Sequence, residues 1–374
     1  DKVAVNFLFN YDLTDDMRAF AEAKYVLQTT ENESQPTAFW DLLFGAPDNP
    51  YLPAFIQPIA NATGGVAITA DPIGIGAGRL EQERETVRIV AGFEGTLAKE
   101  YDYEVYVNYG KFTREARGTE DLVIVDRFFS AIDAVSNNGT PDCRVNVDAS
   151  APQISTPFDI PVYDPGYFTF TPGDGSCVPL NIWAGRPGID QAAVDWITED
   201  SFTKVEIDQL VIAANLAGDS SNWFEMPYGP IYWAVGTEYR EESSDSTIDD
   251  FRQGLIPAGS PFAEGTNIAD YSSNNSIVFR PALRSRNQGG EYDVWEAFVE
   301  TSIPLIEGEA FVEELTLDLA ARYSDYSTVG ETFTWRTNLM YSPITDLRIR
   351  YSLSKAVRAP NISELFAPET GTTF

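Results

Sequence analysis

The feature that most constrains this chain is a long, repeated alternation of apolar and polar residues. Leu315, Leu317 and Leu319 occupy every second position, with charged residues such as Asp318 and Arg322 on the opposite parity. A period of two is the signature of a β-strand with one apolar face. Helical periodicity is nearly missing, so the chain is predicted to be all-β.

The alternation predicts ten strands, and several of them are unusually long. Strands of globular proteins usually have about 5–6 residues, whereas a tilted strand needs about 9–11 residues to cross a bilayer. The predicted strands are residues 2–12, 17–30, 85–97, 101–115, 202–216, 229–242, 290–306, 310–326, 332–342 and 346–355.

Strands of a water-soluble β-sandwich also alternate apolar and polar residues. Aromatic residues and loop lengths distinguish a membrane barrel from such a sandwich. Tyr103 and Tyr109 bracket aliphatic residues on one face of a strand, and Trp233 and Tyr239 do the same on another. Such aromatic ends suit the two interfaces of a membrane. The connections between strands also alternate between short and long. The only exception is the tight turn at 327–331, which is short where a long loop is expected. The expected fold is a transmembrane antiparallel up-and-down β-barrel, with long extracellular loops at 31–84, 116–201 and 243–289.

Composition excludes several classes of function. The formal net charge of −32 disfavours binding to nucleic acid and, more weakly, to strongly anionic ligands. The absence of histidine removes Ser-His-Asp and Cys-His catalysis and every His-ligated metal site within this chain. No apolar run reaches the ~18 residues of a transmembrane helix. Cys143 and Cys177 match no zinc-site spacing, so a loop disulfide in an oxidising compartment is expected, with two free thiols as the alternative.

Three ordered segments resemble those of TonB-dependent outer-membrane receptors. They are the turn 224–230 with the following Gly236–Arg240, the strand Trp295–Leu305, and Tyr351–Phe366, which contains Arg-Ala-Pro and Glu-Leu-Phe. Weaker matches in the same order are Asp48–Pro53, Ala131–Val135 and Cys177–Ile182. The resemblance implies a receptor barrel and covers most of the chain.

A complete member of that family carries an N-terminal plug, a TonB-contacting box and about twenty-two strands, which is within the known range for barrels. The ten predicted strands, with neither plug nor box, resemble the middle of such a barrel. We therefore expect residues 1–374 to be one partial barrel domain of a longer protein. Because Asp1–Val5 already has the pattern of a strand, a signal peptide is expected to precede this sequence.

Charged residues on the non-lipid face are the first candidates for ligand contacts. They could line a solute path or contact the plug, and the alternative is that they only satisfy one another across strands. These candidates are Glu104, Glu238, Arg240, Glu296, Glu300, Asp318, Arg322, Arg336, Arg348 and Arg350.

The loop 116–201 is the second candidate region for ligand binding, because a disulfide would restrain it and it contains many aromatic residues. Its aromatic residues could stack on a sugar or an organic chelate, or could instead pack the loop on itself. The candidates are Tyr163, Tyr167, Phe168 and Trp183. Loop carboxylates could hold Ca²⁺, although no EF-hand pattern is present. No other cofactor, no protein-bound metal and no catalytic residue is expected.

The expected function is TonB-energised uptake of a scarce solute, namely a saccharide, a peptide or a metal chelate, across the bacterial outer membrane. The step in which TonB pulls the plug to open a path is implied by the resemblance alone. Its implied partners are the TonB complex, acting through the plug, outer-membrane lipid and lipopolysaccharide, the solute, and a partner at the cell surface. The alternatives are a passive porin-like barrel and a secreted β-rich glycoside hydrolase that uses two carboxylates. The hydrolase would expose far more apolar surface to water than soluble monomers tolerate.

Overall fold

The computed structural model describes residues 1–33, 39–70, 75, 78–151, 168–255 and 286–366. Its main element is a ten-stranded antiparallel sheet in which neighbours along the chain are neighbours in space. The strands are β1 (Lys2–Thr14), β2 (Met17–Glu33), β5 (Arg79–Leu97), β6 (Tyr101–Val123), β9 (Thr198–Asp219), β12 (Tyr232–Ile248), β13 (Gln288–Glu309), β14 (Val312–Tyr326), β15 (Gly330–Ile344) and β16 (Leu347–Lys355).

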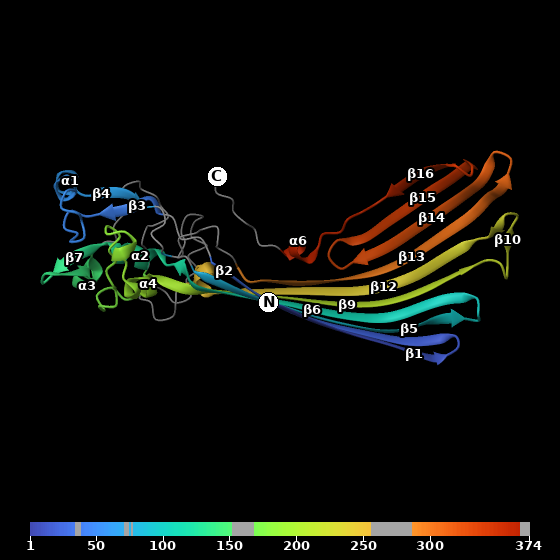
Figure 1. Cartoon of the computed structure of the whole chain (residues 1–374), viewed down its shortest axis with the longest axis horizontal. Coiled ribbons are helices and arrows are strands. Elements are labelled where there is room, and N and C mark those ends of the chain that lie inside the picture. Colours follow the sequence, from blue (N-terminus) through green and yellow to red (C-terminus); the bar gives the residue numbers. More distant parts are fainter. Residues whose placement is uncertain (34–38, 71–74, 76–77, 152–167, 256–285, 367–374) are drawn as a thin grey trace.

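The sheet is curved and open. Figure 1 shows the strands fanning out into a trough, with the short turns at one end. β1 and β16 form the two edges, and within the described residues they do not pair with each other. Each of the ten predicted strands is confirmed as a member of this sheet. Among the described residues, no helix is both long and apolar enough to cross a membrane.

Most strands extend further toward the long-loop end than the alternation predicted. β6 reaches Val123 and β9 begins at Thr198, so the expected loop 116–201 narrows to 124–197. The first loop likewise narrows to 34–78 and the third to 249–287. The hydrogen-bonded ladder continues through polar pairs such as Glu115 opposite Lys204, because backbone pairing outside a membrane needs no apolar side chains. For these longer strands, the apolar pattern therefore predicted only the membrane-sized part.

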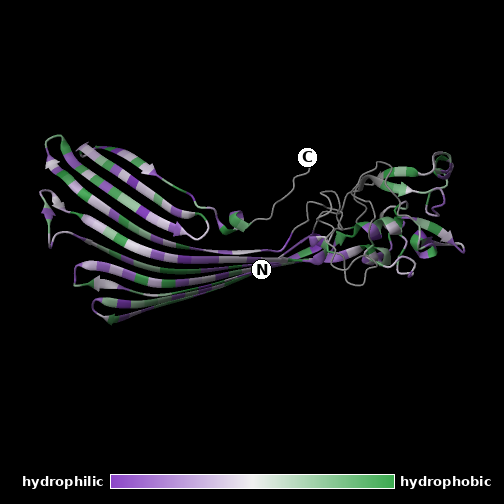
Figure 2. Ribbon diagram, turned by 180° about the vertical axis from the view of Figure 1, so that it is seen from behind, coloured by the Kyte–Doolittle hydropathy of each residue, from purple (hydrophilic) through white to green (hydrophobic). Residues whose placement is uncertain are grey.

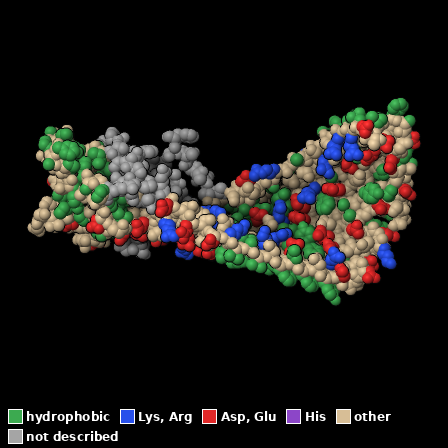
Figure 3. Space-filling view, viewed as in Figure 1, with side chains coloured by type: hydrophobic (Ala, Val, Ile, Leu, Met, Phe, Trp, Pro, Cys, Tyr) green, Lys and Arg blue, Asp and Glu red, His purple; other side chains and the backbone are tan. Residues whose placement is uncertain are grey.

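The register gives the sheet two chemically different faces. Val107 pairs with Ile212 on the outward face, whereas its neighbour Asn108 pairs with Val211 on the concave face. Figure 2 shows the alternation of hydropathy along the strands, and Figure 3 shows acidic and basic side chains gathered in the hollow of the trough. Exposed residues such as Ile89, Val107, Val299 and Tyr351 form the outward surface, which is the arrangement of a lipid-facing barrel wall.

Aromatic side chains cover the outward face near the short turns. The rings of Tyr101 and Trp233 lie 5.6 Å apart, on neighbouring parts of β6 and β12. Both rings lie over Gly218 of β9, where a Cβ atom would collide with Tyr101. A glycine is therefore needed at this position for the aromatic pair to lie flat on the sheet.

The two long loops between β2 and β9 fold together into one compact body, which we call the loop module (residues 39–70, 75, 124–151 and 168–197). The segment between β2 and β5 contributes β3 (Phe39–Gly45), α1 (Gln57–Thr63) and β4 (Val66–Ala70). The segment between β6 and β9 contributes α2 (Val125–Ile132), β7 (Ala134–Asn137), β8 (Thr140–Cys143), α3 (Arg144–Val147) and α4 (Gln191–Ile197).

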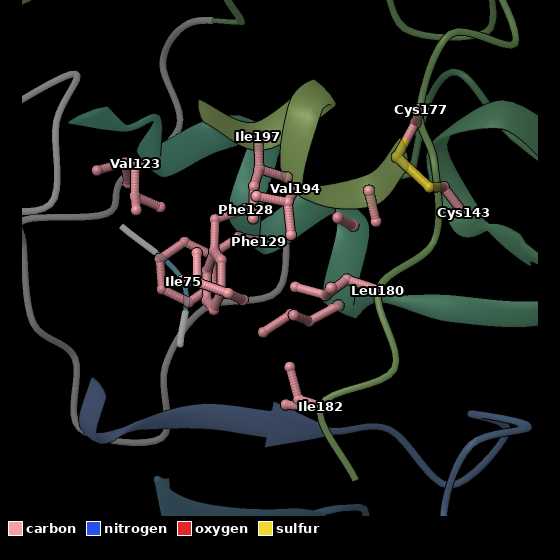
Figure 4. Packing of buried hydrophobic residues seen from close by; sticks show 14 of the residues in the cluster. Ile75, Val123, Phe128, Phe129, Cys143, Cys177, Leu180, Ile182, Val194 and Ile197 are labelled. Atoms are coloured by element: carbon pink, nitrogen blue, oxygen red, sulfur yellow. A yellow bond between two sulfur atoms is a disulfide. The ribbon is translucent and has the colours of Figure 1, made fainter. Parts of the chain in front are cut away.

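One hydrophobic core holds the loop module together. Leu43 and Ile75 of the first loop are fully buried against Phe128, Leu180 and Ile197 of the second. Figure 4 shows Ile75, Phe128, Leu180 and Ile197 converging from both segments, with the Cys143–Cys177 disulfide at the border of the cluster. The expected disulfide is therefore present.

A last helix, α6 (Ile362–Phe366), folds back onto the sheet after β16. Asn361 and Glu364 exchange side-chain to backbone hydrogen bonds of 2.8 and 2.9 Å, which form a capping box. Arg358 donates to both carboxylate oxygens of Glu364, at 2.7 and 2.8 Å. Ile362 packs against Tyr292 and Val294 of β13, so the Arg-Ala-Pro to Glu-Leu-Phe segment turns inward over the sheet.

The two faces predict opposite responses to a charge at neighbouring positions of β13. Val299→Lys places an ammonium on the lipid-facing side and is expected to cost about 2–4 kcal/mol of folding free energy in lipid vesicles. Glu300→Lys, on the concave side, is the matched control and is expected to change stability by less than about 1 kcal/mol. Equilibrium unfolding by urea in vesicles measures both values. Equal costs at the two positions would contradict the assignment of faces.

Candidate functional site

All ten charged candidates lie on the concave face of the sheet. Glu238 pairs with Glu296, and Glu296 pairs with Ser324. Because directly opposite residues point to the same face of a sheet, every second residue of β12, β13 and β14 counted from these three lies on the concave face. The same register places Arg336 opposite Ala320 and Arg350 opposite Met340. The remaining candidates on this face are Glu104, Arg240, Glu300, Asp318, Arg322 and Arg348.

Several of these groups form contacts across strands. Glu296 is buried, and its carboxylate accepts hydrogen bonds from Ser324 Oγ at 2.6 Å and from Arg322 Nη1 at 3.3 Å. Asp318 accepts a hydrogen bond from Ser302 Oγ at 2.8 Å. These contacts show how carboxylates can be stabilised within the wall, since a buried charge needs hydrogen-bonded partners.

Other candidates are free to face solvent or solute. Within the described residues, Glu300, Arg336 and Arg350 make no ion pair or side-chain hydrogen bond with another residue. A concavity lies over β13–β16 and is lined by Glu296, Glu300, Arg322 and Arg336, together with threonine and serine hydroxyl groups. A second concavity near the short turns includes Glu104 and Asn215. Both can bind polar solutes by hydrogen bonding, and whether these residues contact a ligand remains a prediction.

In the described part of the chain, no group of three or more His, Cys, Asp or Glu side chains is arranged to hold a metal ion. Many carboxylates are present, and those that contact another charged group mostly form ion pairs with arginine or lysine. The concave face therefore offers charged groups and hydroxyl groups as possible hydrogen-bonding partners.

Ion pairs connect the two loops of the loop module. Arg144 donates to both carboxylate oxygens of Asp48, at 2.7 and 2.8 Å, and also to Asp133, at 3.0 and 3.1 Å. The hydrogen bond from Arg144 holds the pKa of Asp48 below its ordinary value, and burial raises the pKa of Asp133. The pKa of Arg144 is raised by its carboxylate partners, so its charge is secure at any physiological pH. Asn49 is buried beside this pair and donates to the carbonyl of Ile132 at 2.9 Å.

A second buried charge lies at the start of α2. The Asp126 side chain is almost wholly buried, and it accepts hydrogen bonds from the backbone N–H of Thr169, at 2.6 Å, and from Thr169 Oγ1. Burial raises the pKa of Asp126 to about 6, although the hydrogen bonds and Arg127 favour the charged form. This carboxylate fastens the described part of the loop that follows residue 167 to helix α2.

The aromatic candidates of this loop are used in packing where they are described. Phe168 and Phe170 meet edge to face with ring centroids 5.3 Å apart, and Phe170 meets Trp196 at 5.1 Å. Trp183 packs against Gly45, where a Cβ atom would collide with its ring. Tyr163 and Tyr167 lie outside the described residues. Stacking of Phe168 or Trp183 on a ligand stays a prediction, and their packing contacts favour a structural role.

Sequence reasoning missed α2 and the Asp48–Arg144–Asp133 cluster. A signal for α2 was present, because Val125, Phe128, Phe129 and Ile132 follow the i, i+3, i+4, i+7 spacing of an amphipathic helix. No comparable signal marked the cluster, since Asp48 and Arg144 are 96 positions apart.

Asp126 predicts a pH dependence of the loop module. Because its folded pKa of about 6 lies above the ordinary value of 3.8, the folded state binds the proton more tightly. The contribution of Asp126 to stability should therefore rise by about 2 kcal/mol as pH falls from 7 to 4, whereas Asp48, whose pKa is lowered, contributes with the opposite sign. Hydrogen exchange of the α2 amides, corrected for intrinsic rates, measures this change. Asp126→Asn should flatten the response, whereas Asp174→Asn, an exposed control in the same module, should leave it intact. An unchanged slope in Asp126→Asn would contradict the assignment.

Arg144 predicts that the two loops separate when its charge is removed. Arg144→Ala removes the ion pair with Asp48 that joins the two loops and leaves the largely buried Asp133 without its partner, so docking of the first loop should weaken by about 1–3 kcal/mol. Limited proteolysis within residues 46–66 measures the loss as faster cleavage. Arg79→Ala, which removes an exposed ion pair with Glu31, is the matched control and should change cleavage little. Equal cleavage rates in Arg144→Ala and in the unmodified protein would show that Arg144 does not couple the loops.

Comparison with known proteins places this geometry in a family. The sequence profile of the TonB dependent receptor-like β-barrel matches residues 162–374. No curated protein sequence matches the chain. The similar solved structures include a mutant ferric enterobactin receptor, PfeA, from Pseudomonas aeruginosa, at 13% identity and a TM-score of 0.45. They also include the RagAB peptide transporter, at 9% identity and a TM-score of 0.42. The ferric preacinetobactin receptor BauA from Acinetobacter baumannii is similar at 9% identity and a TM-score of 0.37.

The alignments cover 96%, 91% and 92% of this chain, and 34%, 30% and 38% of those three structures, respectively. The chain thus spans about a third of the length of the structures that it resembles. The family consists of receptors and transporters of the outer membrane and not of enzymes. On the strength of the profile match, which extends over more than half of its residues, the chain belongs to the TonB-dependent receptor family.

Proposed function

We propose that this chain contributes the barrel wall and extracellular loops of a receptor that takes up a scarce solute with energy delivered through TonB. The observation that carries the proposal is the division of one continuous sheet into an apolar outward face and a charged concave face. A wall of this kind separates lipid from a polar path. The solute class is a saccharide, a peptide or a metal chelate.

The loop module supports a receptor rather than a plain pore. Its two loops share a core, a disulfide and the Arg144 ion pairs, so it presents a fixed surface beyond the long-loop end of the strands. A fixed surface loses less conformational entropy when it binds a ligand than a free loop does. We expect solute to meet this module first and the concave face afterwards.

The TonB complex and the plug are proposed from the family to which the chain belongs, and the other partners from the arrangement of the faces and loops. The TonB complex would act through a plug, lipid and lipopolysaccharide would surround the outward face, and a surface partner would reach the loop module. Ca²⁺ could bridge loop carboxylates to lipopolysaccharide. A passive porin-like barrel remains the second candidate function, because a charged concave face also suits diffusion of small polar solutes.

Uptake measured in bacteria tests the proposal. Cells that produce the receptor should accumulate labelled solute above the external concentration, and accumulation should fall to background when the receptor gene or tonB is deleted. Dissipating the proton-motive force should have the same effect. Candidate saccharides, peptides and ferric chelates are supplied in parallel as growth-limiting nutrients. Uptake that survives loss of TonB and only equilibrates with the medium would support the porin and contradict the proposal.

A further inference from the structure

The short turns at one end of the sheet carry exposed large apolar side chains. Phe311 in the β13–β14 turn is 82% exposed, and Trp223 in the β9–β12 connection is 67% exposed. The strand ends beside the other short turns also carry such a residue: Leu13 near the end of β1, Leu97 at the last position of β5, and Ile344 at the last position of β15. We call these five residues the turn rim. Burying apolar surface is favourable, so a row of exposed apolar side chains along this end of the sheet indicates a contact that the isolated chain does not satisfy.

Phe311 is held outward against its own backbone preference. Its φ of 66° lies in the left-handed region, which bulky residues rarely adopt. The Tyr341 hydroxyl donates to the Phe311 carbonyl oxygen at 2.8 Å, and Tyr341 belongs to the outward face of β15. The turn is therefore fastened to the lipid-facing wall, with its aromatic ring projecting beyond it.

The turn rim is continuous with the lipid-facing surface. Leu97 pairs with Tyr101, and Ile344 pairs with the exposed Leu347; Tyr101 and Leu347 have the outward parity of their strands. The Tyr228 hydroxyl donates to Glu309 at 3.4 Å, which connects the β9–β12 segment to the turn of Phe311. This continuity favours lipid over a separate protein as the occupant.

The charges of the turns select among lipids. The short turns carry the carboxylates Asp15, Asp16, Glu100, Glu225 and Asp346, with Glu309 at the adjoining end of β13, and Lys99 is the one cation of these turns. Carboxylates attract an ammonium group and repel a headgroup with net negative charge. A zwitterionic phospholipid with a primary ammonium satisfies both the apolar side chains and the carboxylates.

We propose that the turn rim inserts into the membrane interface and preferentially binds phospholipids with a primary ammonium headgroup, anchoring this end of the barrel. The inference rests on the proposed function, because it requires the outward face to lie in lipid. It goes beyond that function by assigning a lipid contact to the turns themselves.

Fluorescence quenching in vesicles tests the location of the turn rim. The complete receptor, with its disulfide intact, carries one environment-sensitive probe at Phe311→Cys in phosphatidylethanolamine and phosphatidylcholine vesicles. Shallow nitroxide lipids should quench it strongly and aqueous iodide weakly. Val299→Cys, on the outward face, should respond to deep nitroxides, and Val147→Cys, exposed on α3, should respond to iodide alone. Leu97→Cys is a second rim position in case Phe311→Cys does not fold.

The controls separate the two ways in which the inference could fail. Quenching of both rim probes by iodide alone, with Val299→Cys still in lipid, would overturn the rim contact and leave the barrel standing. Iodide quenching at Val299→Cys as well would refute the membrane wall and, with it, the proposed function.

The headgroup preference is tested with nitroxide attached to phosphatidylethanolamine or to phosphatidylglycerol at equal mole fraction. Quenching at residue 311 should be at least about twofold greater with phosphatidylethanolamine, and the double variant Glu309→Gln, Asp346→Asn should reduce the ratio toward one. Equal quenching by the two lipids in the unmodified turns would overturn the ammonium preference.

Discussion

The structure depends on the continuous antiparallel ladder of ten strands in sequence order, in which the eight inner strands pair on both sides and β1 and β16 pair on one. In lipid an unpaired peptide group costs several kcal/mol, so only a wall whose backbone is fully paired can lie there. The ladder also fixes parity, because a slip of one residue would exchange the two faces. Leu319 faces outward and Arg322 inward only because the register between β13 and β14 is maintained.

Beyond the membrane-sized part of the strands, stability has a different origin. β5, β6, β9 and β13 continue as polar ladders, and two of the loops acquire a core of their own. That core cannot form from either loop alone, since Leu43 and Ile75 fill it from one side and Phe128 and Ile197 from the other. The Cys143–Cys177 disulfide restrains the second loop, and Arg144 ties the first loop to it through charge. A rigid module thus stands at the end of the barrel where solute is expected to arrive.

The strands and the division of the charged residues between faces could be predicted from the sequence, because a period of two is a local property. The ten charged candidates share one face for the same reason, although what they bind stays a prediction. The loop module could not be predicted, because its core joins segments that are far apart in the chain and its α-helices have only four to eight residues, too few for a clear helical pattern. Helix α6 shows an intermediate case: the Asn361 to Glu364 spacing is a capping box visible in the sequence, but its docking onto Tyr292 is not. The burial of Asp126 could not be predicted either, since nothing near this residue in the sequence indicates that Thr169 will be its hydrogen-bond partner.

The most direct test of the account is a nitroxide scan along β14, from residue 315 to residue 323, in the complete receptor in lipid vesicles. Collision rates with oxygen, which concentrates in lipid, and with a water-soluble nickel complex are measured at each position. The account predicts a period of two, with oxygen contact highest at 315, 317, 319, 321 and 323 and nickel contact highest at the positions between them. Equal nickel contact on both parities would contradict it, because both faces of the sheet would then lie in water.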